Sequence, residues 1–282
     1  MIATGDLRTL VNGLDHPEGV ALGPDQMLYA GGEAGQVYRI DPWAGTFEQV
    51  ADTGGFVLGL CLDGRGRIYV CDSARAAILR IDPDTAHVDV YCESAAEAPL
   101  ICPNWPAFAP NGDLWFSDSG REILAVREGR LLRVPPGGGQ ADVAKLPPLH
   151  FPNGLAVAED GTVYLLESFT PKLSSYRGDG LKTIAEFPGV VPDGVALCRD
   201  GSFIVACYYP YRLLQVTQSG AVTTLLDDET GIHCPMPTNV AFFGEGLREL
   251  AIASLGGTAI TALDPGCEGA ALSYPSFDLS AA

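Results

Sequence analysis

The chain lacks any run of about 18 apolar residues, the length that a membrane-spanning helix needs. Its first ten residues, MIATGDLRTL, contain neither the basic nor the apolar stretch of a secretory signal. None of the eight cysteines stands in a C-x-x-C pair, which argues against a zinc site or a thiol redox motif. We therefore expect a cytoplasmic protein with reduced thiols and no membrane partner.

Basic residues are scarce as well, with 17 Lys and Arg against 35 Asp and Glu and a formal net charge of −18. Such an acidic surface repels phosphate backbones, so we expect no nucleic-acid partner. The sequence also has no serine-nucleophile elbow with a matching triad and no glycine-rich phosphate loop between a strand and a helix. We expect a small-molecule substrate and a monomer or small homo-oligomer.

A repeat with a period in the forties runs through the chain. Each copy has a proline or small residue, a variable residue, a glycine or similar residue, two apolar residues, a turn and a β-rich run. The variable residue stands, at spacings of 40, 46, 49, 40 and 45, at Glu18, Leu58, Asn104, Asn153, Asp193 and Thr238. This period is typical of a four-stranded propeller blade, whereas a β-sandwich of similar strand content would not explain six near-equal repeats.

The six copies predict an all-β protein: a six-bladed β-propeller whose four-stranded antiparallel blades surround a central channel. We expect a single domain over residues 1–282. Asp-Gly and Asn-Gly pairs at Gly64, Gly112, Gly161 and Gly201 should supply the positive φ angles of tight hairpins. Because a closed ring leaves no exposed sheet edge, we expect Leu7–Asn12 to add a strand to the last blade.

The variable position is the part of the repeat that can carry chemistry. The first strand of every propeller blade starts near the axis, so the six variable residues should form a ring. Four of them offer oxygen donors, namely Glu18, Asn104, Asn153 and Asp193. Facing carboxylates and amides are costly if unpaired, and a hard cation removes that cost. All-oxygen ligation predicts one divalent metal ion and favours Ca²⁺, with Mg²⁺, Mn²⁺ or Zn²⁺ as alternatives.

Several motifs together resemble one known family. They are PEG at Glu18, PN at Asn104, FPNGLA at Asn153 and PDGVA at Asp193, with the runs Glu167–Pro171 and Thr238–Phe242. Over nearly the whole chain they are similar to the senescence-marker-protein/gluconolactonase/luciferin-regenerating-enzyme-like family. The calcium propellers of the paraoxonases and diisopropyl fluorophosphatase resemble the chain more distantly.

The family resemblance implies a hydrolase that opens lactones with a divalent metal. It implies Glu18, Asn153 and Asp193 as central ligands, and Asn104 as a ligand or a substrate contact. Several sugar lactonases of the family hold the sugar with an arginine two residues before that asparagine. Cys102 stands at this position here, so a less polar lactone or ester is as good a candidate as a sugar lactone.

The expected mechanism is attack by water on an ester carbonyl that the metal polarises. The resemblance points to Asp193 as general base, although a carboxylate bound to a dication is a weak base. Histidine is the alternative base because its pKa lies near neutrality. His16 and His150 stand just before two variable positions and are therefore also candidate catalytic residues.

The remaining site candidates are substrate contacts. His233 precedes the sixth variable position, Trp105 adjoins Asn104, and Tyr208 belongs to a group of aromatic residues expected at the same end of the blades. We expect structural roles for Glu33 and Glu167, which follow strand-like runs. His87, in an outer hairpin, is expected to be inert.

Two other functions remain open. The first is a non-catalytic propeller that binds metal or serves as a binding platform, because a fold alone does not establish catalysis. The second is a condensing enzyme similar to the strictosidine-synthase-like propellers, which lack the metal ring. Metal analysis and a panel of lactones would distinguish the three hypotheses.

Overall fold

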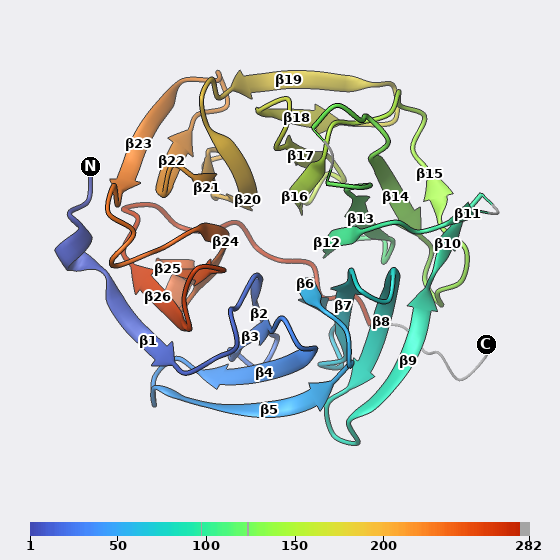
Figure 1. The fold of residues 1–282 in the computed structure, drawn as a ribbon, viewed down its shortest axis with the longest axis horizontal. Helices are drawn as coiled ribbons and strands as arrows, with labels where there is room; N and C mark the ends of the chain where they lie inside the picture. Colours follow the sequence, from blue (N-terminus) through green and yellow to red (C-terminus); the bar gives the residue numbers. More distant parts are fainter. Residues whose placement is uncertain (97, 123, 277–282) are drawn as a thin grey trace.

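The computed structural model describes residues 1–96, 98–122 and 124–276 and has the predicted six-bladed architecture (Figure 1). The first three blades, each ordered from the axis outwards, are β2 (Val20–Leu22), β3 (Leu28–Gly31), β4 (Gln36–Asp41) and β5 (Thr46–Asp52); β6 (Val57–Leu62), β7 (Ile68–Asp72), β8 (Ala77–Asp82) and β9 (His87–Cys92); and β12 (Pro103–Phe108), β13 (Leu114–Asp118), β14 (Arg130–Val134) and β15 (Asp142–Val143).

The fourth to sixth blades repeat this order. They are β16 (Pro152–Val157), β17 (Val163–Glu167), β18 (Lys172–Tyr176) and β19 (Leu181–Glu186); β20 (Val191–Leu197), β21 (Phe203–Tyr209), β22 (Arg212–Val216) and β23 (Val222–Asp227); and β24 (Pro237–Phe243), β25 (Glu249–Ser254), β26 (Ala259–Leu263) and β1 (Arg8–Asn12). The N-terminal strand β1 pairs with β26 and so closes the ring, which confirms the strand expected near residues 7–12.

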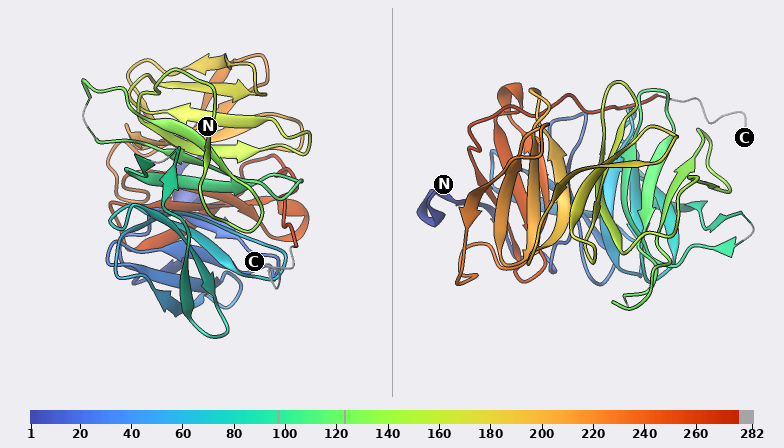
Figure 2. Two further views of the ribbon diagram at one scale, coloured as in Figure 1. Left: turned by 90° about the vertical axis from the view of Figure 1, so that its right-hand side faces the viewer. Right: turned by 90° about the horizontal axis from the view of Figure 1, so that it is seen from above.

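Outside the six blades, the described residues contain little regular secondary structure. A small hairpin joins β10 (Ser94–Ala95) to β11 (Ala98–Pro99), and two 3-10 turns are η1 (Thr4–Asp6) and η2 (Glu245–Leu247). In the part of the chain that the structure describes, no helix has the length and apolar character needed to cross a membrane. The protein is a flat disc in which neighbouring blades pack side by side (Figure 2).

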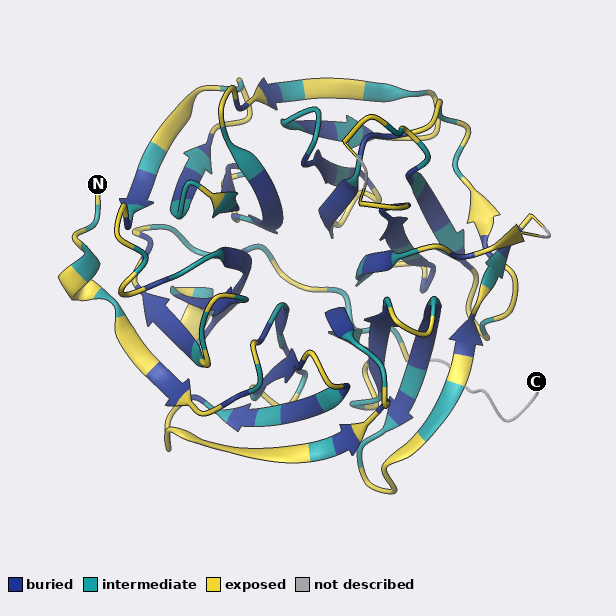
Figure 3. Ribbon diagram, in the orientation of Figure 1, coloured by how far each residue is buried: buried dark blue, intermediate teal, exposed yellow. Residues whose placement is uncertain are grey.

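The core is divided among the six blade-to-blade interfaces. Over the described residues, six clusters of buried apolar side chains each combine residues from two neighbouring blades. The inner strands are largely buried, whereas the outer strands face solvent over much of their length (Figure 3). Burial of apolar surface therefore stabilises the ring as a whole, because each blade covers the faces of both neighbours.

A β-bulge lies at the start of the inner strand in five blades. In β16, for example, Pro152 pairs with Glu167 and Leu155 with Leu165, so the strand has one extra residue between these pairs. The same shift occurs in β6, β12, β20 and β24. A bulge turns a side chain away from the regular alternation of a strand. In these five blades the bulge takes the variable residue of the repeat out of the regular strand pairing.

The hairpin glycines behave as predicted with one exception. Gly112, Gly161 and Gly201 have φ angles of 89°, 80° and 81°. The prediction for Gly64 is wrong: the left-handed residue of its turn is Gly66, with a φ of 78°. A Cβ on Gly64 would lie 2.4 Å from Ser276 Oγ and 2.8 Å from the carbonyl oxygen of Tyr274. This glycine is needed because the C-terminal segment passes close to the turn.

Candidate functional site

The six variable residues meet around the axis and form what we call the axial ring: Glu18, Leu58, Asn104, Asn153, Asp193 and Thr238. Glycines show how closely neighbouring members pack. A Cβ on Gly19 would lie 2.4 Å from the carbonyl oxygen of Leu58, one on Gly59 2.5 Å from that of Asn104, one on Gly154 2.5 Å from that of Asp193, and one on Gly194 2.6 Å from that of Thr238. Thr238 Oγ1 donates a hydrogen bond of 2.6 Å to the carbonyl oxygen of Glu18, which connects the last blade to the first.

Glu18 and Asp193 lie close enough to repel each other. Burial raises the pKa of Glu18 to about 8, with further contributions from Glu33 and Glu122. Burial also raises the pKa of Asp193 well above its ordinary value, and the charge of Glu18 adds to this effect. A hydrogen bond from Asn153 opposes the rise at Asp193 only in part. Two carboxylates that are far apart in the sequence are therefore both buried in the axial ring, within range of each other's charge.

A serine orients the amide of Asn153. Asn153 Nδ2 donates to Ser168 Oγ at 3.2 Å, and Ser168 Oγ donates in turn to the carbonyl oxygen of Pro192 at 2.7 Å. In the preceding blade, Ser119 Oγ donates to the carbonyl oxygen of Pro152 at 2.7 Å. Because the bond to Ser168 uses the amide nitrogen, the amide oxygen of Asn153 remains available as an acceptor.

The ring fits a hard cation. The Oε2 atom of Glu18 is buried and has no hydrogen-bond partner. Asn104, Asn153 and Asp193 are buried beside it in the ring. A divalent ion would neutralise the two carboxylates and supply the partner that Glu18 lacks. The structure thus brings together Glu18, Asn153 and Asp193, with Asn104 at the next position of the same ring.

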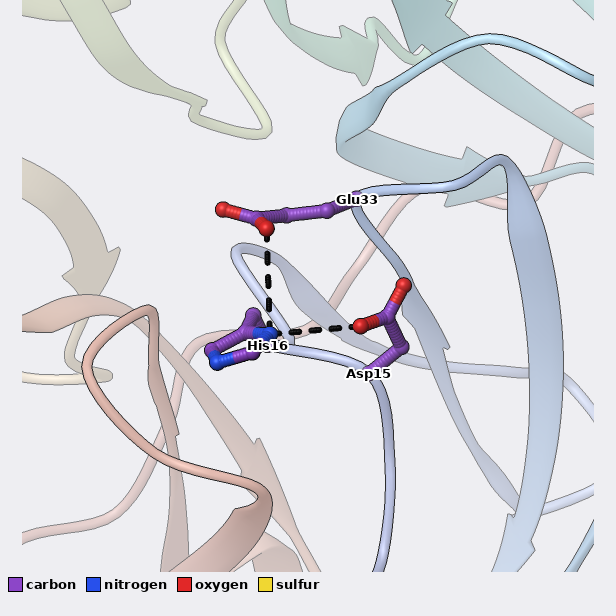
Figure 4. Close-up of side chains that lie close together, drawn as sticks. All are labelled: Asp15, His16 and Glu33. Atoms are coloured by element: carbon purple, nitrogen blue, oxygen red, sulfur yellow. Dashed lines mark hydrogen bonds and ion pairs between the residues drawn. The ribbon is translucent and has the colours of Figure 1, made fainter.

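His16 precedes the ring residue Glu18 by two positions, and its imidazole lies beside the carboxylates of Asp15 and Glu33 (Figure 4). Its Nδ1 is 3.2 Å from Asp15 Oδ1 and 3.7 Å from Glu33 Oε2, and one ligand atom from each residue lies within 4.8 Å of the others. Burial alone would raise the pKa of Asp15, but hydrogen bonds from His16 and from the Ala34 N–H lower it. The ionised Asp15 can accept a hydrogen bond from His16 Nδ1 and so orients the imidazole.

The other two candidate histidines differ from His16. His150 is buried, with Nε2 2.7 Å from the carbonyl oxygen of Leu124 and Nδ1 3.0 Å from Thr170 Oγ1. Both of its nitrogens thus lie within hydrogen-bond distance of a partner, and the imidazole links the loop that contains Leu124 to the one that contains Thr170. His233 is exposed, and its Nδ1 lies 3.8 Å from Asp228 Oδ1. Of the three, only His16 is exposed and also has a carboxylate oxygen within hydrogen-bond distance of its ring nitrogen.

Acidic side chains create a negative electrostatic potential at the open end of the axial ring, which we call the mouth. Burial raises the pKa of Tyr208, and the charges of Glu18, Glu122 and Asp193 raise it further. Burial also raises the pKa of Cys102 to about 12, with contributions from Asp118, Glu122 and Glu18, so this thiol stays neutral. No motif of the repeat pointed to Glu122, because it lies in a loop between β13 and β14 that has no counterpart in the other repeats.

Trp105 forms the floor beneath the ring. A Cβ on Gly59 would lie 2.4 Å from its Cε3, and one on Gly19 3.0 Å from its Cζ3. Beyond Trp105 the axis contains an apolar cavity of about 120 Å³, lined by the later residues of the inner strands and closed by the C-terminal residues 270–274. Trp105, which the sequence predicted to contact substrate, therefore lies under the axial ring, between the mouth and this cavity.

Buried carboxylates fix the chain just before the ring. Asp118 accepts hydrogen bonds from the N–H groups of Ile101 and Cys102 at 3.1 and 2.7 Å and pairs with Arg130. Glu167 accepts one from the His150 N–H at 2.7 Å, which agrees with the structural role expected for it. These carboxylates at the ends of the second strands determine how the chain approaches the axis.

We expect Asp118→Ala to lower the free energy of unfolding by about 3–5 kcal/mol, because Arg130 and two N–H groups would lose their buried partner. Urea unfolding followed by circular dichroism measures this loss. The control is Asp142→Ala, which removes an exposed partner of Arg133 and should cost less than about 1 kcal/mol. Equal losses in the two variants would contradict the anchoring role.

We expect Gly154→Ala to lower the free energy of unfolding by about 1–3 kcal/mol, as is typical of overpacking. The new Cβ would meet the backbone of the neighbouring strand β20, 2.5 Å from the Asp193 carbonyl oxygen and 2.6 Å from Gly194 Cα. Because this separates Asn153 from Asp193, affinity for divalent metal should also fall by about 10- to 100-fold. Gly5→Ala, where a Cβ meets nothing within 4 Å, is the control for both measurements.

The fold and the ring define a class of protein, a six-bladed propeller with carboxylate and amide oxygens gathered at one end of its axis. The profile of the SMP-30/Gluconolactonase/LRE-like region matches residues 17–256, and the chain belongs to this family. The resemblance inferred from the motifs is thereby confirmed.

Known structures share the fold at low sequence identity. A gluconolactonase from Xanthomonas campestris is 22% identical, with a TM-score of 0.77 over 92% of this chain and 89% of that one. A calcium-binding protein, regucalcin, from Agrobacterium tumefaciens is 16% identical, with a TM-score of 0.78 over 96% and 97%. A luciferin-regenerating enzyme is 19% identical, with a TM-score of 0.78 over 96% and 99%. No curated protein matches the sequence significantly.

Proposed function

We propose that this protein is a divalent-metal-dependent lactonase or a related carboxylic ester hydrolase. The observation that carries the proposal is the meeting of Glu18 and Asp193 in the axial ring, where Glu18 Oε2 is buried without a partner. Membership of a family that includes gluconolactonases supports hydrolysis of a lactone. The calcium-binding relative supports a hard cation as the cofactor.

Four residues of the ring would hold the metal. Glu18 and Asp193 supply the two negative charges, and Asn153 and Asn104 supply neutral oxygens, a donor set that suits Ca²⁺ best. When bound, the ion supplies Lewis-acid polarisation of the ester carbonyl and stabilisation of the oxyanion. Ser168 keeps the amide of Asn153 oriented through its hydrogen bond, and Trp105 supports the ring from below.

His16 and Asp193 are the candidate bases for the attacking water. His16 is oriented by Asp15, whose Oδ1 lies 3.2 Å from Nδ1, and in the neutral imidazole with a proton on Nδ1 the Nε2 atom would receive the proton of the water. That proton would then pass to the alkoxide oxygen that is released when the lactone ring opens, and the product is a hydroxy acid. Asp193 in its anionic form can accept the same proton, but coordination to a cation lowers its basicity.

The walls of the mouth favour a small, weakly polar lactone. Cys102 contributes a neutral thiol at the position where sugar lactonases of the family carry an arginine. The rings of Phe151 and Phe169 stack at 4.7 Å and add an apolar wall on the same side of the disc. His233 and Tyr208 are the polar candidates for orienting the substrate at the rim.

A lactone panel assayed with and without metal tests the proposal. Protein treated with a chelator should lose ring-opening activity, by at least about 100-fold, because the transition-state oxyanion loses its main stabilisation. Addition of Ca²⁺, Mn²⁺, Zn²⁺ or Mg²⁺ to separate samples should restore it and rank the ions. Five-, six- and seven-membered lactones, with and without sugar hydroxyls, define the preferred ring and polarity.

Two results would favour the other hypotheses. A protein that contains stoichiometric metal but hydrolyses neither lactones nor esters would be a non-catalytic metal-binding propeller. A protein that binds no metal at the ring would be a candidate for condensation chemistry of the strictosidine-synthase-like kind. Metal content is therefore measured on the same samples as activity.

A further inference from the structure

Two cysteines lie next to each other far from the axial ring. The Sγ atoms of Cys198 and Cys267 are 3.3 Å apart, although 69 residues separate them in the sequence. Cys198 is buried at the end of the inner strand of the fifth blade, and Cys267 is partly exposed in the segment that follows the last strand. Both are free thiols in the structure.

The backbone holds these two segments in register. Cys198 forms an antiparallel bridge with Gly269, the Arg199 N–H donates to the Glu268 carbonyl at 2.8 Å, and the Ala270 N–H donates to the Leu197 carbonyl at 2.8 Å. We call residues 265–276 the C-terminal strap. It runs along one face of the disc (Figure 2).

The strap covers the end of the axis opposite the ring. Its residues 270–274 close the apolar axial cavity. Tyr274 Oη donates to the carbonyl oxygen of Leu22 at 2.8 Å, and the Gly64 N–H donates to the carbonyl of Pro275 at 2.8 Å. Leu22 is the last residue of β2 and Gly64 lies in the turn after β6, so Cys267 stands at the start of a segment that spans from the fifth blade to the first two.

We infer that Cys198 and Cys267 form an oxidisable dithiol site, which a small-molecule disulfide such as oxidised glutathione converts into a disulfide that fastens the strap to the fifth blade. A disulfide joins sulfurs about 2.05 Å apart, so the two Sγ atoms need to approach by only about 1.3 Å. The partial exposure of Cys267 gives a soluble oxidant access to one of the two sulfurs.

The reaction proceeds by two exchanges. The thiolate of Cys267 attacks one sulfur of oxidised glutathione, forms a mixed disulfide and releases one glutathione thiolate. Cys198 then gives its proton to the released glutathione thiolate and attacks the Cys267 sulfur, which forms the protein disulfide, breaks the mixed disulfide and releases the second glutathione as its thiolate. The hydrogen bond from Cys198 lowers the pKa of Cys267, which favours Cys267 as the first nucleophile.

The test is thiol mapping of the full-length protein after incubation with oxidised glutathione or with dithiothreitol. Digestion without reduction, followed by mass spectrometry, should show a peptide joining Cys198 to Cys267 only in the oxidised sample. Cys198→Ser should stop at a stable mixed disulfide on Cys267. Cys61→Ala, which changes a cysteine of the axial cavity, should leave the cross-link intact.

Unfolding provides a second readout. A disulfide that closes so long a loop restricts the unfolded chain, so the oxidised protein should have a higher thermal unfolding midpoint than the reduced protein. Cys267→Ser should show no dependence on the oxidant. Oxidation that leaves both thiols free, or that joins either of them to another cysteine, would overturn the inference. Lactone hydrolysis takes place at the other end of the axis and does not enter the test.

Discussion

Asp193→Asn should lower kcat/KM for lactone hydrolysis by about 10²- to 10³-fold or more, the usual effect of removing one electrostatic contributor to the transition state. The substitution keeps an oxygen at this position of the ring but removes one of the two charges that neutralise a dication. It also removes a candidate base. Steady-state kinetics at saturating metal measures the loss, and circular dichroism checks the fold.

A control for Asp193→Asn exists in the same blade. Asp200 lies in the turn at the far end of β20, where its Oδ1 accepts hydrogen bonds from the backbone N–H and the hydroxyl of Ser202, and Asp200→Asn should retain activity. His16→Gln separates the two candidate bases. If His16 is the base, this variant keeps its bound metal and loses kcat. Full activity of Asp193→Asn would remove Asp193 from the mechanism.

Glu18→Gln should abolish the stabilisation of the protein by divalent metal and, without metal, make the protein less sensitive to pH. In wild type, metal at 100 times its dissociation constant should raise the free energy of unfolding by about 2.7 kcal/mol. In the variant this increment should be close to zero, because the ring loses a charged ligand. Denaturant unfolding with and without metal measures both values.

The pH dependence follows from the raised pKa of Glu18. This pKa moves from an ordinary value of 4.5 to about 8 in the folded protein. Between these values the folded state binds more protons than the unfolded chain, so metal-free wild type should lose stability as the pH rises through this range. Glu18→Gln should flatten that slope. Glu48→Gln, which changes an exposed carboxylate of an outer strand, is the control; a flattened slope in this control would contradict the assignment to Glu18.

The fold was predictable because one pattern recurs six times. Each copy carries its own turn and its own apolar alternation, and in the first five blades strands that are consecutive in the chain pair with each other. The closing strand β1 was predictable for a related reason, since an unclosed ring would expose a sheet edge. The error at Gly64 arose because a contact with the distant C-terminal segment, and not the turn, requires that glycine.

The site was only partly predictable. Glu18, Asn153 and Asp193 occupy equivalent positions in the repeat, so the repeat alone predicted that they lie together. Glu122 lies in an irregular loop, and its effect on Glu18 depends on where that loop folds. His150 and His16 have similar places in the sequence, yet one is bonded through both nitrogens and the other has an orienting carboxylate.

The amino-acid sequence by itself determined the blade count, the closed ring and the oxygen-bearing residues that face the axis, because periodic patterns specify local structure and equivalent positions. Only the tertiary structure decided which polar groups remain without partners, which histidine is oriented, and that Cys198 and Cys267 lie together. These properties depend on burial and on distances between segments far apart in the chain. No local pattern encodes such distances, since they arise only when the blades have packed.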